Sequence, residues 1–123
     1  MNWMILLSRA LMAAIFIQAG IGKAMAPSET MAGFARLHVF IPGAAYAVAL
    51  LVEIGVGLAF LIGWKARTAA LILAIWCIAT ALAAHSHLDD RAQMINFMKN
   101  LCMAGGFLQV VAYGAGRFSV DRK

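Results

Sequence analysis

Charged residues are scarce in this chain. Only 12% of its 123 residues are Asp, Glu, Lys or Arg, and five of these are acidic, whereas soluble domains carry about 25% charged residues. A soluble core of this size could not bury the 64% of residues that are hydrophobic. The shortage of charge therefore argues against a soluble domain and predicts one integral membrane domain over residues 1–123.

Cysteine is also rare, and common cofactor motifs are missing. Cys77 and Cys102 lie in separate apolar runs and form no C-x-x-C pair, so we predict two small apolar residues and no disulfide. The sequence has no nucleotide-binding motif. His85 and His87 are two positions apart at the end of an apolar run, where their rings would point in different directions. We therefore predict no metal site.

The excess of basic residues gives the chain a net charge of +5. Most of them flank apolar runs, where lysine and arginine bind lipid headgroups and set the orientation of a membrane protein. No basic patch is interleaved with exposed aromatic residues, which argues against a nucleic-acid partner. Six basic residues on one side against four on the other favour both termini in the cytoplasm of a bacterial cytoplasmic (inner) membrane.

Long apolar runs account for most of the remaining sequence. A helix needs about 20 apolar residues to cross a bilayer core, and four runs reach or approach that length. We predict an all-α fold, an integral membrane four-helix transmembrane bundle. Its helices are expected at about 3–22, 43–64, 68–85 and 95–113. Between the first two, residues 24–42 are expected to place a short amphipathic helix on the membrane surface.

Glu53 is the only acidic or basic residue within the second apolar run. A charge near the middle of a membrane costs at least about 2.5 kcal/mol unless it is paired. Depths counted from the ends of the runs place Arg9 about 6 Å from Glu53 along the membrane normal, so we predict an Arg9–Glu53 pair. Ala49 and Gly57 flank Glu53 on the same helix face, where small residues let another helix approach. The pair could equally be a structural clasp or part of a ligand or proton site.

A second polar group is predicted near the outer face. Lys23 ends the first run, His85 ends the third, and Asn96, Lys99 and Asn100 begin the fourth. Gln109 is expected near the depth of Arg9. This group could form a pocket with His85 as proton carrier, or it could reflect interfacial snorkelling. For Lys99 and His87 we favour snorkelling, and for His85 and Asn100 both readings stay open. The candidate ligand-binding residues are Arg9, Lys23, Glu53, His85, Asn100 and Gln109, and the candidate catalytic residues are Glu53, Arg9 and His85.

Several of these residues belong to short sequence motifs that follow one another along the chain. The pieces are Arg9…Phe16…Gly20-Ile-Gly-Lys23, Phe40-Ile-Pro42, Glu53-x-Gly-x-Gly-Leu58…Gly63-x-x-x-Arg67, Ala84-His85-x-His87, Asn96-Phe97-x-x-Asn100-Leu101 and Gly116-Arg-Phe-Ser119-Val-Asp121. Together they resemble the DoxX family of small four-helix bacterial membrane proteins. The family name comes from a subunit linked to thiosulfate and quinone oxidation, and some members look like parts of membrane redox systems. The resemblance implies fold and location more strongly than reaction.

Three functions are consistent with these features. The resemblance favours a quinone- or redox-associated membrane component with a buried Arg9/Glu53 polar core, for which quinone is the implied cofactor. The alternative is a non-enzymatic membrane subunit or assembly factor, which would bind another membrane protein or a second copy of the chain. A weaker alternative is a small proton-coupled transporter that uses Glu53. The residues alone do not decide whether the chain is an enzyme.

Overall fold

The described part of the chain is mostly helical. The structure is a computed structural model, and it describes residues 2–38, 40–84, 89–116 and 118–121. Within these ranges every regular element is a helix, which confirms the predicted all-α class. The elements are α1 (Asn2–Met25), α2 (Pro27–Arg36), α3 (Pro42–Leu50), the π-helix η1 (Leu51–Val56), α4 (Gly57–Ile62), α5 (Ala66–Ala84) and α6 (Arg91–Tyr113).

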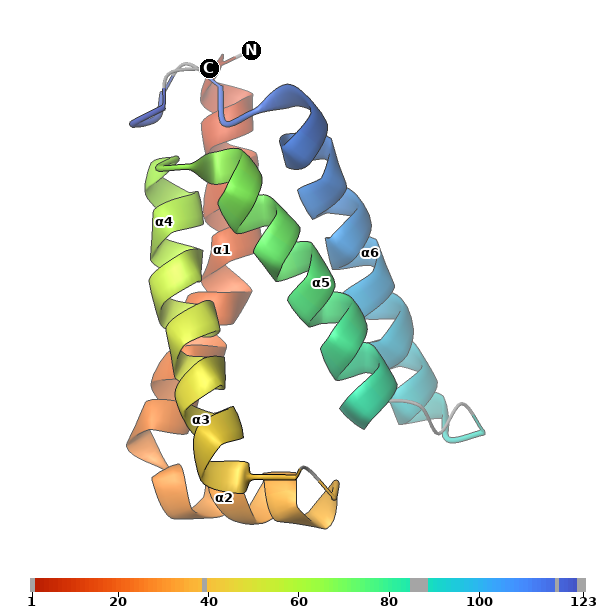
Figure 1. The fold of residues 1–123 in the computed structure, drawn as a ribbon. Coiled ribbons are helices and arrows are strands. Elements are labelled where there is room, and N and C mark those ends of the chain that lie inside the picture. The colour runs from red at the N-terminus through yellow and green to blue at the C-terminus, as the bar shows by residue number, and fades with distance from the viewer. Residues whose placement is uncertain (1, 39, 85–88, 117, 122–123) are drawn as a thin grey trace.

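The chain forms four long helical segments, which we call passes, and one shorter helix, α2, that lies across one end of the bundle (Figure 1). The four passes are α1, the run of α3, η1 and α4, then α5 and α6. The elements α3, η1 and α4 follow one another as a single rod that runs antiparallel to α1. The next two passes, α5 and α6, lie side by side and pack along each other. Both termini lie at one end of the molecule, whereas α2 lies across the other end. The α5–α6 pair diverges from α1 and α3 toward the α2 end.

Three of the four passes have the length and composition of membrane spans. These are Trp3–Met25, Pro42–Ile62 and Ala66–Ala83. The fourth pass, α6, has 23 residues, enough to cross a bilayer core, but its N-terminal half carries several polar side chains. Its role as a fourth span therefore stays a prediction. It begins at Arg91, before the predicted residue 95, because the Asp90 side chain accepts a hydrogen bond from Ala92 N and caps the helix.

Aromatic rings join the passes in the core. The ring centroids of Phe16 on α1 and Phe107 on α6 are 5.5 Å apart, and Phe60 on α4 packs edge-on against Phe107 at 5.0 Å. All three side chains are buried. Along α1, Phe16 lies between Arg9 and Lys23. The aromatic cluster therefore separates the polar residues at the two ends of the bundle.

The C-terminal segment is fixed on the turn between α4 and α5. Gly63 ends α4 with φ +78°, a conformation that glycine adopts without steric cost. Val120 N donates to Ile62 O, and Asp121 N donates to Gly63 O, both at 2.9 Å. The Asp121 carboxylate accepts from two consecutive backbone N–H groups at the N-terminus of α5, at 2.9 and 2.7 Å. This segment thus caps a helix whose own first residues offer no acidic side chain.

Candidate functional site

Glu53 lies on η1, the π-helical segment within the rod formed by α3 and α4. In a π-helix each backbone hydrogen bond spans one residue more than in an α-helix, and such segments often occur at functional sites. Both Val52 and Glu53 are buried here, and only 5% of Glu53 is exposed. The irregular backbone and the buried carboxylate therefore coincide at one position of the fold.

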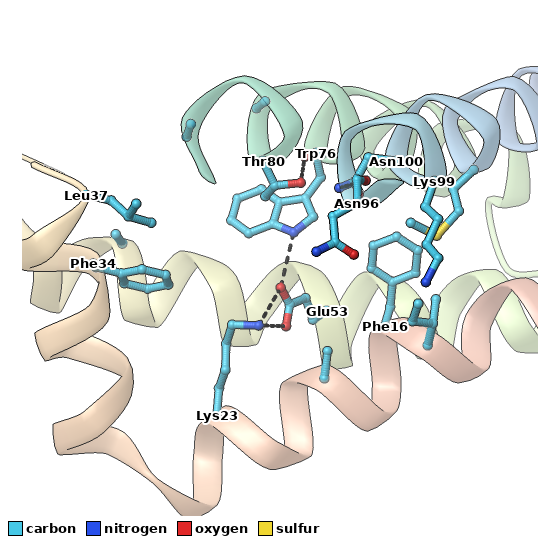
Figure 2. Close-up of a pocket in the computed structure, with 16 residues that line it drawn as sticks. Phe16, Lys23, Phe34, Leu37, Glu53, Trp76, Thr80, Asn96, Lys99 and Asn100 are labelled. Atoms are coloured by element: carbon cyan, nitrogen blue, oxygen red, sulfur yellow. Dashed lines mark hydrogen bonds and ion pairs between the residues drawn. The ribbon is translucent and has the colours of Figure 1, made fainter. Parts of the chain in front are cut away.

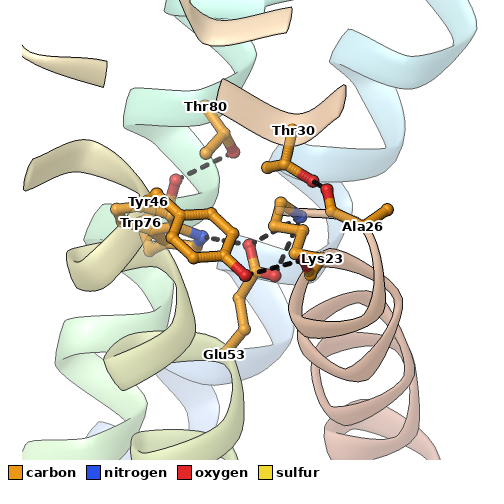
Figure 3. Close-up of polar contacts among 7 residues, drawn as sticks. All are labelled: Lys23, Ala26, Thr30, Tyr46, Glu53, Trp76 and Thr80. Atoms are coloured by element: carbon orange, nitrogen blue, oxygen red, sulfur yellow. Dashed lines mark hydrogen bonds and ion pairs between the residues drawn. The ribbon is translucent and has the colours of Figure 1, made fainter. Parts of the chain in front are cut away.

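Glu53 is neutralised by Lys23 (Figure 3). The Lys23 ammonium donates to both carboxylate oxygens, at 2.9 Å to Oε1 and 3.2 Å to Oε2. Trp76 Nε1 on α5 donates to Oε2 at 3.2 Å. Charge-assisted hydrogen bonds of this kind lower the cost of holding a carboxylate in an apolar setting. The helices α1, η1 and α5 thus meet at one carboxylate.

Neighbouring hydroxyl groups hold the backbone around this ion pair (Figure 3). The Tyr46 hydroxyl on α3 donates to Lys23 O at 2.9 Å, which satisfies a carbonyl in the last turn of α1. Thr80 Oγ1 donates to Trp76 O at 2.9 Å within α5. Thr30 Oγ1 on α2 donates to Ala26 O at 2.8 Å. The Tyr46 and Thr30 bonds fix the end of α1 and the start of α2 next to the Lys23–Glu53 pair.

Arg9 does not pair with Glu53, so that prediction is wrong. Its Nη1 atom donates to the backbone oxygens of Phe60 and Leu61, and its Nη2 atom donates to Phe118 O. The residue is fully buried. Its charge is held by carbonyl dipoles of α4 and the C-terminal segment, and no carboxylate is bonded to it within the described ranges.

The stagger between α1 and the antiparallel rod explains this difference. A Cβ atom built on Gly20 would lie 2.5 Å from Ile54 Cγ1 and 3.2 Å from Glu53 Cβ, so Glu53 is level with Gly20. Arg9 is 11 positions from Gly20, about 16 Å along the helix axis. Lys23 is three positions away, about 4.5 Å. Depths counted from the ends of the apolar runs ignored the stagger and selected the wrong basic residue.

A cavity of about 510 Å³ lies beside the ion pair (Figure 2). Its walls come from α1, η1, α3, α5 and α6, and from α2 with the residue that follows it. The volume falls in the range of small-molecule sites, about 300–1,000 Å³. The lining residues are Ile15, Phe16, Ala19, Lys23, Phe34, Leu37, Ala45, Glu53, Trp76, Ala79, Thr80, Ala83, Asn96, Lys99, Asn100 and Met103.

Polar groups of α6 line the cavity beside Glu53. Asn96, Lys99 and Asn100 all line it, and their labelled side chains extend from α6 over the space above α1 in Figure 2. Asn100 Nδ2 donates to Asn96 O at 3.1 Å. The Lys99 ammonium makes no hydrogen bond or ion pair with any described residue. The cavity is therefore apolar over most of its wall and rich in N–H donors over a small part of it.

The predicted site residues divide into three groups. The structure brings Lys23, Glu53 and Asn100 to one cavity. Arg9 lies beyond the aromatic cluster, and Gln109 is exposed on α6 and does not line the cavity, so the polar core predicted for Arg9 and Gln109 beside Glu53 is wrong. His85 lies outside the described residues. Gln109 was misplaced because helical periodicity gives a face but not the neighbour that the face meets.

Sequence reasoning missed the tryptophan that completes the site. Trp76 has no special neighbours in the sequence, yet its indole N–H binds the only acidic side chain of the second pass. A buried indole N–H usually finds an acceptor, so a tryptophan inside an apolar run was a usable signal. Phe34 and Leu37 were expected on an amphipathic surface helix, and they also line the cavity. Among the described residues, no three His, Cys, Asp or Glu side chains converge on a metal position.

The fold and the cavity define a class of protein. The chain has helices able to span a membrane, a carboxylate held by a lysine between them, and an amphipathic cavity next to that pair. The sequence profile of the DoxX family matches residues 4–86. The chain belongs to the DoxX family and is an integral membrane protein.

Two relatives of known location support this assignment. The chain is 38% identical to the inner membrane protein YqjF of Escherichia coli (strain K12) over 118 residues, which cover 96% of this chain and 89% of that protein. It is 30% identical to the inner membrane protein YphA of the same organism over an alignment of 125 positions, which covers 98% of this chain and 89% of that protein. No solved structure matches the chain.

Proposed function

We propose that the cavity binds a quinone that enters from the lipid, and that the chain is a quinone-associated component of the bacterial inner membrane. The observation that carries the proposal is the cavity of about 510 Å³ that joins an apolar wall to a group of N–H donors. The location is carried by the two relatives, which are named as inner membrane proteins. In this proposal the chain supplies the binding site, and a partner protein supplies electrons.

The composition of the cavity suits a quinone headgroup. A quinone is a flat ring with two carbonyl acceptors and an apolar tail. Phe16, Phe34 and Trp76 offer aromatic surface for the ring. Lys99, the Asn96 amide and the second N–H of the Asn100 amide offer donors for a carbonyl oxygen. Small-molecule sites typically combine a mostly apolar wall with a few placed polar groups in this way.

Trp76 provides a direct measurement of binding. Trp3 and Trp64 are 61% and 49% exposed, and neither lines the cavity. A Trp3→Phe/Trp64→Phe protein therefore reports through Trp76 alone. Titration with a short-chain ubiquinone in detergent should quench its fluorescence along a saturable curve. Quenching that rises linearly with quinone, as collisions in the micelle would give, contradicts the proposal.

A matched pair of variants tests whether the cavity is the site. Asn100→Leu removes a polar group that lines the cavity, and Gln109→Leu makes a comparable change nine positions along the same helix, on an exposed surface. We expect Asn100→Leu to weaken quinone binding by about three- to tenfold, the usual worth of one hydrogen bond. Gln109→Leu should leave the affinity unchanged. Equal affinities for the two variants would place the quinone elsewhere.

A further inference from the structure

The cavity holds more positive than negative charge. Two lysines line it, Lys23 and Lys99, but Glu53 is the one acidic residue among the described residues of its wall. The Lys23 ammonium binds both oxygens of Glu53, so that pair is neutral as a unit. Lys99 has no carboxylate within ion-pair distance among the described residues. One positive charge in the cavity wall is therefore uncompensated.

The remaining hydrogen-bonding groups favour an acceptor ligand. The Trp76 indole N–H is already bound to Glu53. The Lys99 ammonium has three donors and no acceptor, and it extends from α6 toward Phe16 in Figure 2. Lys99 is an exposed residue that lines the cavity, so its ammonium is open to a ligand that enters there. An oxyanion in that ligand would bind the ammonium through charge-assisted hydrogen bonds.

We infer that the cavity selects ligands whose head carries a negatively charged oxygen, and that Lys99 binds this oxygen. This inference rests on the proposed function, because it specifies the chemical form of the molecule that the cavity accepts. The shared chemistry is an oxyanion attached to an apolar body. An ionised hydroxyquinone, a fatty acid and an acidic phospholipid all have it, and experiment separates these sources.

Two naphthoquinones of similar size test the charge preference. At neutral pH 2-hydroxy-1,4-naphthoquinone is an anion, whereas 2-methyl-1,4-naphthoquinone is neutral. In the Trp3→Phe/Trp64→Phe protein, held in nanodiscs of zwitterionic lipid, the anion should bind at least about tenfold more tightly. Lys99→Gln should abolish the preference and Lys99→Arg should keep it. Arg91→Gln, a charge removal on the same helix outside the cavity lining, should also keep it.

The outcomes separate this inference from the proposed function. Equal affinity for the two compounds, or a preference that survives Lys99→Gln, overturns the inference and leaves quinone binding in place. If neither compound quenches Trp76 saturably, both fail. If the anion is preferred, dodecanoate and phosphatidylglycerol are added in turn as competitors against the bound anion. Displacement by dodecanoate supports a carboxylate source, displacement by phosphatidylglycerol supports a lipid headgroup, and displacement by neither supports the ionised quinone.

Discussion

Arg9 and Lys23 lie on the same face of α1, yet their charges are stabilised in different ways. Lys23 is compensated by the Glu53 carboxylate. Arg9 is compensated by backbone carbonyls of Phe60, Leu61 and Phe118, which come from two segments far apart in the sequence. The planar guanidinium reaches both segments at once, which a lysine ammonium could not do in the same geometry. Arg9 is thus a structural residue that joins α1 to α4 and the C-terminal segment, whereas Lys23 belongs to the cavity.

Removing only the lysine of the Lys23–Glu53 pair should lower the unfolding free energy more than replacing both residues. In Lys23→Met a buried carboxylate is left without its cation, and we expect a loss of about 3 kcal/mol in unfolding free energy. In Lys23→Met/Glu53→Met both charges are replaced by apolar side chains, and most of that loss should be recovered. Thermal unfolding in one detergent measures both variants. A double variant no more stable than Lys23→Met would show that the ion pair is not what the lysine contributes.

At the scale of elements, the apolar runs predicted the helices but not their registers. Residues 43–64 read as one helix, and the chain does form one rod there, but η1 interrupts it at Leu51–Val56. A π-helix leaves the apolar pattern nearly unchanged over six residues, so periodicity could not reveal it. The stagger of α1 against the rod was equally hidden, because spacing within one helix does not fix its offset from another helix. The face assigned to Glu53 was sound, because Ala49 and Gly57, which flank it, are both buried.

The close approach of α1 to η1 depends on Gly20. A Cβ atom there would lie 2.5 Å from Ile54 Cγ1, whereas a Cβ atom on Gly22, on the same helix, would meet no atom within 4 Å. Gly20→Ala should therefore separate the two elements and lower the unfolding free energy by about 1–3 kcal/mol. Gly22→Ala should be neutral or raise it by up to about 1 kcal/mol, because alanine favours the helix.

The same pair of variants links the packing to the cavity. Because Gly20 is level with Glu53, a displaced α1 moves Lys23 relative to its carboxylate. We expect Gly20→Ala to weaken saturable quinone quenching of Trp76, and Gly22→Ala to leave it unchanged. Equal shifts in stability for the two alanine variants would show that the α1–η1 contact tolerates a methyl group.

At the scale of the whole molecule, the polar residues form two groups at opposite ends. Arg9 and Asp121 belong to the end that holds both termini, and the Lys23–Glu53 pair belongs to the α2 end. The aromatic cluster of Phe16, Phe60 and Phe107 lies between them. The sequence paired Glu53 with Arg9 because it fixes the depth of a residue only within its own helix. The divergence of α5 and α6 from α1 and α3 toward the α2 end is a relation between helices and has no local signal in the sequence.

The position of α6 decides how many times the chain crosses the membrane. Its polar side chains lower its hydropathy, but Asn96, Lys99 and Asn100 all line the cavity. Polar residues that face the interior of a bundle are compatible with a membrane span. We therefore expect α6 to cross the bilayer, so that the C-terminus returns to the side of the N-terminus, as their shared end in Figure 1 indicates.

Reporter fusions test this topology. Alkaline phosphatase, active only outside the cytoplasm, should be active when fused after Asp89 and inactive when fused after Asp121, and green fluorescent protein should give the opposite result. Basic residues favour this orientation with both termini in the cytoplasm. The reverse pattern would invert the protein but keep four spans. The same reporter active at both positions would place α6 on the membrane surface, because then only the three apolar passes cross. In that case Lys99 would face headgroups, and the cavity could not receive a ligand from the bilayer core.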